Sequence, residues 1–390
     1  MNKVDKTSPR ASFAPPLTQA DSTEGASLQT PLPSKTWRSL SGLAGSSRAL
    51  ITPRLREAAP LLVLLRDDEE AGYFYSDLAQ YLGEDRVLLF PSAYRRAIRY
   101  GHRDEANVLL RSMVLSALLS EKKRGRSHLP ILVTYPEALL EGVPKEGDQP
   151  IETLLIRKGD LVDRDELRDK LLSWGFERVD YVYEPGQFAL RGSIVDVYSF
   201  ASELPYRLDF FDDEVESLRR FEVDSQLSVG QLEEITLSPD LAKSRGALVS
   251  LLSLLPRGTQ LLLSGRASLA TRLQMTWDEA PLLQDGEGFR DLDELRTMLI
   301  EPQTLLHELQ SYSGYEFTTE AEPEGIHFHT ERQPLFHKDY EALATQIRSW
   351  KKRGYTVWLS ASTEAAYERV LDILTPHLKP TELPQRTAIT

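Results

Sequence analysis

The segment Gly42–Ala49, GLAGSSRA, has glycines spaced as in a loop that holds phosphate groups. A working phosphate loop needs glycine for close backbone approach, lysine for the terminal phosphates and a serine or threonine hydroxyl for magnesium. Here Arg48 stands at the lysine position, Ser47 at the preceding glycine position and Ala49 at the hydroxyl position. A methyl group cannot ligate magnesium, and a guanidinium does not replace an ammonium at a crowded site. We therefore expect no nucleotide in this loop, with weak ATP binding as the alternative. The loop positions concerned are Gly42, Gly45, Ser47, Arg48 and Ala49.

A second group of residues has the chemistry of a protein-binding surface. In the stretch YRLDFF at 206–211, the two-residue period of a strand places Tyr206, Leu208 and Phe210 on one face, as a core stripe. Arg207, Asp209 and Phe211 then lie on the other face, where Phe211 is expected to be exposed.

Neighbouring strands bring further arginines to this open face. Arg191 is expected in the preceding strand and Arg219 in the following one. An exposed phenylalanine bracketed by arginines is typical of an interface hot spot. The alternative is that Phe211 packs at the hairpin tip, while Arg191 or Arg207 pairs with Asp196 or Asp209.

The elements around these residues predict an α/β fold. Short apolar runs at 61–65, 87–90 and 131–134 alternate with amphipathic helices at 67–82 and 105–119. Strands and helices in alternation indicate a parallel sheet covered on both faces. The phosphate loop belongs to this domain, whose two parts we expect at 36–150 and 238–325, after a flexible leader at 1–35.

An inserted α+β domain is expected at 151–237, between the two parts of the parallel-sheet domain. It contains a helix at 163–174 and strands at 188–198, 206–211 and 216–223, with a hairpin tip at 212–214. The second part of the α/β domain follows, with a helix expected at 247–255 and a strand at 259–263. Residues 326–390 are expected to begin a small following α/β domain, with helices at 340–352 and 364–374 and a strand at 356–359.

Composition excludes several classes of function. The chain has 390 residues, a formal net charge of −13 and no cysteine, which argues against non-specific duplex binding and against cysteine-ligated zinc. No apolar run is long enough to span a bilayer, so a cytoplasmic protein without a membrane partner is expected. His327 and His329 share a strand face without a third ligand nearby, and no catalytic or metal site is predicted.

Two long runs, GFERVDYVYEPGQFALRGSIVDVYSF at 175–200 and SELPYRLDFFDDEVESLRRFEVDSQ at 202–226, carry a family likeness. They resemble the UvrB-homologous module of bacterial transcription-repair coupling factors. The likeness extends from about residue 39 to 240 and more weakly to 323, and the segment near 333–375 resembles the start of the next domain of the same family. In that family a helicase-like domain with a degenerate phosphate loop surrounds the module.

The resemblance implies a non-catalytic adaptor that recruits UvrA to stalled RNA polymerase during transcription-coupled nucleotide excision repair of damaged DNA. It assigns UvrA binding to Arg191, Arg207 and Phe211, and to Arg219 of the SLRRF strand as a fourth residue. RNA polymerase and double-stranded DNA would be bound by parts of the full-length parent absent from this chain. ATP and magnesium would serve that parent's DNA-translocating, helicase-like hydrolase motor, so this stretch needs no cofactor. The alternative is a UvrB-like, damaged-DNA-binding ATPase or helicase subunit.

Overall fold

The computed structural model describes residues 31–93, 105–124, 129–145, 153–240, 247–279, 296–359, 361 and 364–386. Most of the expected leader, residues 1–30, lies outside the described residues. Within the described part, no helix combines the length and apolar character needed to cross a membrane.

A seven-stranded sheet, parallel throughout, confirms the predicted α/β domain. Its strands, in spatial order, are β17 (Ile326–His327), β1 (Trp37–Ser41), β16 (Ser313–Phe317), β15 (Gln260–Ser264), β2 (Leu61–Leu64), β4 (Ile131–Thr134) and β3 (Val87–Phe90). The edge strand β17 pairs with β1, one residue past the expected boundary at 325. The sheet therefore combines strands from both sides of the inserted domain.

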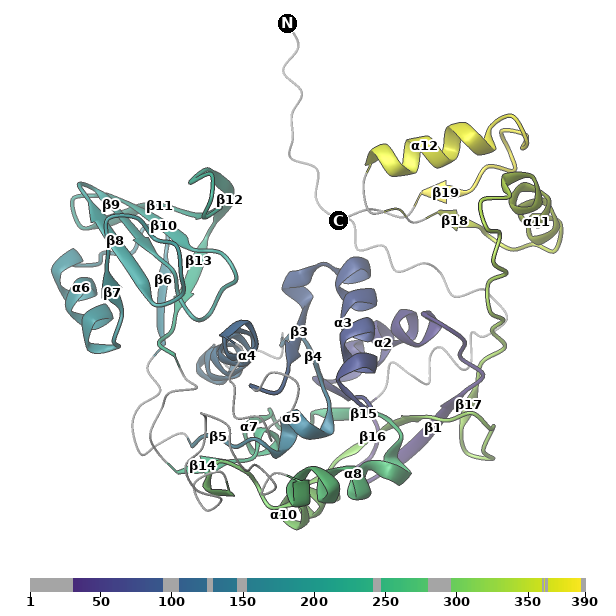
Figure 1. The fold of residues 1–390 in the computed structure, drawn as a ribbon, viewed down its shortest axis with the longest axis horizontal. Helices are drawn as coiled ribbons and strands as arrows, with labels where there is room; N and C mark the ends of the chain where they lie inside the picture. The colour runs from purple at the N-terminus through teal and green to yellow at the C-terminus, as the bar shows by residue number, and fades with distance from the viewer. Residues whose placement is uncertain are drawn as a thin grey trace, which may run out of the picture.

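Helices cover both faces of this sheet, as Figure 1 shows. One layer contains α2 (Ser47–Ala58), α3 (Asp68–Leu82) and α4 (Glu105–Arg124), of which α3 and α4 pack on β3. The other contains α5 (Pro136–Leu140), α7 (Leu251–Leu254), α8 (Arg266–Glu279) and α10 (Pro302–Leu309). A short 3₁₀ turn, η2 (Glu84–Arg86), leads from α3 into β3.

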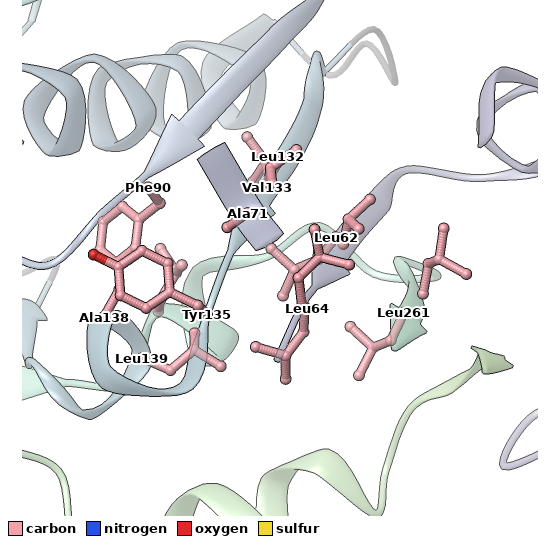
Figure 2. Packing of buried hydrophobic residues seen from close by; sticks show 14 of the residues in the cluster. Leu62, Leu64, Ala71, Phe90, Leu132, Val133, Tyr135, Ala138, Leu139 and Leu261 are labelled. Carbon is pink, nitrogen blue, oxygen red and sulfur yellow. The ribbon is translucent and has the colours of Figure 1, made fainter. Parts of the chain in front are cut away.

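A sheet covered on both faces favours strands that are largely apolar at successive positions, as β2 (LLVL) and β4 (ILVT) are. All four residues of β2 are buried, as are all four of β4. Leu62, Leu64 and Leu261 pack in the cluster drawn in Figure 2, together with Phe90 and Tyr135. This continuous core holds the ends of β1 and β2 in place, and with them the phosphate loop.

Two pairs of short strands lie where the parallel-sheet domain meets the inserted one. β5 (Val143–Pro144) pairs antiparallel with β14 (Leu248–Val249) on the host side. On the inserted side, β6 (Leu154–Arg157) pairs with β13 (Glu234–Leu237). The helix predicted at 247–255 is thus wrong in its first half, because the chain pairs with β5 before Ser250 caps the short α7.

The inserted domain contains a six-stranded sheet and one helix, α6 (Arg164–Ser173). The strand order is β12 (Ser228–Leu232), β11 (Glu214–Phe221), β10 (Tyr206–Phe211), β9 (Ile194–Val197), β8 (Gln187–Arg191) and β7 (Glu177–Arg178). The single strand predicted at 188–198 is wrong, since it is two antiparallel strands turning at Gly192, whose φ is +60°. Leu167 and Leu171 of α6 pack on one face of the sheet. The opposite face, termed the open face below, carries a smaller buried cluster of Val182, Ala189, Tyr198 and Phe221.

The C-terminal unit consists of α11 (Tyr340–Lys352), β18 (Trp358–Leu359), α12 (Glu364–Leu374) and β19 (Gln385–Arg386). The strands β18 and β19 are parallel, and Ile347 and Leu374 belong to a small core of their own. Both helices have the bounds that their apolar periodicity predicts.

Candidate partner-binding surface and degenerate phosphate loop

The hairpin β10–β11 separates a buried stripe from an exposed one, as the strand period predicts. Tyr206, Leu208 and Phe210 are at most 4% exposed and face α6. The next side chain, Phe211, is 71% exposed. A bulge between Asp209 and Phe210 shifts the register, and the chain then turns at Asp212, whose φ is +52°. The Phe211 ring is therefore presented to solvent at the end of its strand.

Arg191 and Arg207 converge on one buried carboxylate, that of Asp196. Asp196 lies on β9 between the two arginine strands, opposite Ala189 and Arg207, and its side chain is fully buried. Arg207 donates from Nε at 2.7 Å and from Nη2 at 2.9 Å, while Arg191 donates from Nη2. This hydrogen bonding raises the pKa of Arg207. The shared carboxylate fixes both guanidinium groups on the open face.

The structure therefore brings Arg191 and Arg207 together, through the pairing with Asp196 that the alternative interpretation named. The extra strand β9 separates their strands and supplies the carboxylate. The side chain of Arg191 remains 32% exposed and stacks on Tyr181 at 5.0 Å. That of Arg207 is only 14% exposed and lies 4.4 Å from the centre of the Phe221 ring. Arg191 is the more accessible of the two to a partner.

The third arginine, Arg219, lies directly opposite Arg207 in the register of β10 and β11. Its Nη2 is 3.3 Å from Asp209 Oδ2, and about 30% of each side chain is exposed. Ion pairs this exposed contribute little to stability. Arg219 and Asp209 can therefore exchange this contact for one with a partner at small cost.

Leu161 is a residue of this surface that the sequence did not reveal. It precedes α6 and forms an antiparallel bridge with Glu214, which itself pairs with Phe211. Residues paired across antiparallel strands point to the same face, so Leu161 lies in one row with Glu214 and Phe211. Its side chain is 81% exposed. In the sequence Leu161 is one of two apolar residues, with Val162, in a polar segment, and the bridge that positions it joins residues far apart in the chain.

The degenerate loop lies between β1 and α2, where a phosphate loop is expected. Gly42 and Gly45 have φ of +73° and +56°, and Ser47 is the first residue of α2, with its hydroxyl donated to the Ala44 carbonyl. Ala49 is 3% exposed and packs in the main core. The position that would need a magnesium-binding hydroxyl is thus a core position.

Arg48 is engaged by a carboxylate of the neighbouring helix. Its Nη1 lies 3.2 Å from Glu70 Oε1, and its guanidinium stacks 5.1 Å from the Phe317 ring. Glu70 also accepts from the Ser264 hydroxyl at 2.9 Å and from the Arg66 backbone N–H at 3.0 Å. These contacts join α2, α3 and β15 beside the loop, and they give Arg48 a structural partner in place of a phosphate.

The two histidines considered as metal ligands, His327 and His329, have ring centres 4.8 Å apart. His327 Nδ1 is 2.9 Å from the Ser41 hydroxyl. Across the described part of the chain, no group of three or more histidine, cysteine, aspartate or glutamate side chains is arranged to hold a metal ion.

Comparison with known proteins assigns the inserted domain. Residues 154–242 match the family model described as UvrB interaction domain, which covers the surface of β8–β11. The chain is 30% identical over 204 residues to the transcription-repair-coupling factor of Escherichia coli and 31% identical over 202 residues to that of Bacillus subtilis. It is 27% identical over 210 residues to the UvrABC system protein B of Chlorobium limicola.

These similarities cover about half of this chain but a small part of each relative. The aligned region is 52% of the chain and 17% of the Escherichia coli protein, and 50% of the chain and 30% of the Chlorobium protein. The resemblance to transcription-repair-coupling factors is confirmed over that half of the chain.

Proposed function

We propose, from the premise that this chain carries a UvrB interaction domain and resembles transcription-repair-coupling factors, that it binds UvrA through the open face of β8–β11. In this proposal it is a non-catalytic adaptor that recruits UvrA to stalled RNA polymerase in transcription-coupled nucleotide excision repair. The observation that carries the proposal is the Phe211 ring, which is 71% exposed at the end of the strand that also carries Arg207, one of two arginines held in place by the buried carboxylate of Asp196.

The surface is suited to binding because its charged groups are ordered before a partner arrives. Asp196 restrains Arg191 and Arg207, so less side-chain freedom is lost on association. Arg191 can offer its remaining N–H groups to a partner carboxylate, and Phe211 and Leu161 supply apolar area on either side of Glu214. Aromatic and arginine side chains of this kind are those in which binding energy concentrates.

The Escherichia coli transcription-repair-coupling factor aligns with this chain over 17% of its own length. We propose that contacts with RNA polymerase and double-stranded DNA, and the ATP- and magnesium-dependent translocating motor, lie in segments outside this chain. The stretch itself is proposed to turn over no ATP, because Ala49 offers no hydroxyl and Arg48 is bound to Glu70.

A UvrB-like ATPase is the second candidate, favoured by the similarity to the UvrABC system protein B. The two functions predict opposite results in an ATPase assay with the purified chain and DNA. ATP turnover that is abolished by Arg48→Ala would favour the ATPase, whereas a rate at the level of the buffer favours the adaptor.

The test of the adaptor compares two arginines with equally exposed side chains. Arg191 on the open face and Arg168 on α6 are each 32% exposed and each paired with aspartate. Arg191→Glu should abolish binding in a calorimetric titration with purified UvrA, while Arg168→Glu should leave it unchanged. Thermal unfolding of both variants checks that the fold is retained. Equal affinities for UvrA would refute the surface assignment.

A further inference from the structure

The segment that follows β17 lies across the degenerate phosphate loop. β17 extends the sheet by pairing with the end of β1, Ser41 opposite His327. The pairing continues into the loop, since Phe328 N–H donates to the Ser41 carbonyl at 2.9 Å and Thr330 N–H donates to the Gly42 carbonyl at 3.2 Å. The residues 327–330 are thus bound by the backbone of the loop itself.

The side chain of Thr330 completes this contact. Its hydroxyl donates to the Gly42 carbonyl at 2.7 Å and accepts the Ala44 backbone N–H at 2.7 Å. In a working phosphate loop, backbone N–H groups of this kind hold the phosphate oxygens. In this chain the Ala44 N–H already donates to the Thr330 hydroxyl oxygen. A phosphate would have to displace Thr330 to accept from this N–H.

The two glycines of the loop differ in what they face. A Cβ added to Gly42 would lie 1.9 Å from the Phe328 carbonyl oxygen and 2.8 Å from His327 Cε1. A Cβ added to Gly45 would meet nothing within 4 Å, although both residues have positive φ. Gly42 therefore permits close approach of the segment, as a phosphate-loop glycine permits close approach of a nucleotide.

Apolar contacts hold the segment in this position. Ile326 is 6% exposed and belongs to the main core, and the partly buried Phe328 packs against that core. Both ends of the contact are therefore anchored: one by β17, the other by Thr330 at the loop.

From these contacts we infer that the degenerate phosphate loop is a docking site for residues 327–330 of the same chain. The segment takes the place of a nucleotide as the ligand of the loop, and it fixes the point from which the chain leaves the sheet toward α11. This inference does not depend on UvrA binding, since the loop and the surface of β8–β11 are in different domains.

The first test compares Gly42→Ala with Gly45→Ala by hydrogen exchange of the complete chain. Both changes place alanine at positive φ, so backbone strain is common to them, and only Gly42→Ala adds the collision with Phe328. We expect the amides of Phe328 and Thr330 to exchange roughly tenfold faster in Gly42→Ala than in Gly45→Ala. Equal rates in the two variants would overturn the inference.

The second test changes only the side chain of Thr330, so it introduces no backbone strain. It can be carried out even if the Gly42→Ala variant does not fold. Thr330→Val removes the hydroxyl and keeps the side-chain shape, and Thr330→Ser keeps the hydroxyl. The Ala44 amide should exchange roughly tenfold faster in Thr330→Val, and near the wild-type rate in Thr330→Ser. Exchange of Ala44 that is the same in Thr330→Val and wild type would show that the segment is not the ligand of the loop.

Discussion

Replacing Phe211 by alanine should weaken UvrA binding without weakening the fold. A phenylalanine buries about 150–250 Å² when it is fully covered. Because 71% of Phe211 is exposed, a partner can cover roughly 110–180 Å² of it. At about 25 cal/mol per Å² this area corresponds to about 3–4 kcal/mol, close to that of an interface hot spot.

The expected result is an increase in Kd for UvrA of roughly 100- to 700-fold, since about 1.4 kcal/mol corresponds to a factor of ten. The unfolding midpoint in urea should change little, because substitutions of exposed side chains usually alter stability by about 0.5 kcal/mol or less. Isothermal titration calorimetry measures the first quantity and circular dichroism the second.

Leu172 provides the matched control. It is a large apolar side chain, 48% exposed, on α6, whose Leu171 packs on the opposite face of the same sheet. Leu172→Ala should leave the Kd for UvrA unchanged. If Phe211→Ala binds UvrA as tightly as Leu172→Ala does, the reasoning from exposed area is wrong.

Two further predictions concern stability. Glu141→Gln should lower the free energy of unfolding by about 3–5 kcal/mol in a urea titration, because it removes the carboxylate charge 3.3 Å from the guanidinium of Arg111, which is buried with it; a loss below about 1 kcal/mol would contradict this. Asp67→Ala should cost about 1 kcal/mol, because the carboxylate caps α3 by accepting the Glu70 N–H at 2.8 Å. Burial alone would raise the pKa of Asp67, but this N–H and Arg66 together lower it, so the stabilisation is present above the unfolded-state pKa and is lost as pH falls through the folded-state pKa. The difference in stability between wild type and Asp67→Ala should therefore shrink in acid, and a constant difference would contradict the assignment.

The elements that sequence predicted well are those with a strong local period. The apolar spacing of α11 and α12 defined both helices, and alternation in β10 placed Phe210 inside and Phe211 outside. The position of the loop between β1 and α2 also agrees with its expected place between a strand and a helix. These features depend on neighbours within a few residues.

The features that sequence missed depend on pairing between distant segments. The two-residue turn at Gly192 starts a new strand, β9, and so places Asp196 between Arg191 and Arg207. The alternation of apolar and polar residues does not reveal this turn. The bridge from Leu161 to Glu214 and the contact of Thr330 with Gly42 join residues far apart in the chain. Registers of this kind are set by the packed fold, so a single sequence does not reveal them.

The paired strands at the base of the inserted domain have a mechanical consequence. The chain leaves the host at β5 and returns at β14, and the Lys145 N–H donates to the Ala247 carbonyl at 2.9 Å. Departure and return are thus one hydrogen bond apart, and β6 and β13 pair again on the far side. A force applied to the inserted domain is therefore shared by two strands that lie side by side, instead of acting on the host sheet through a single strand.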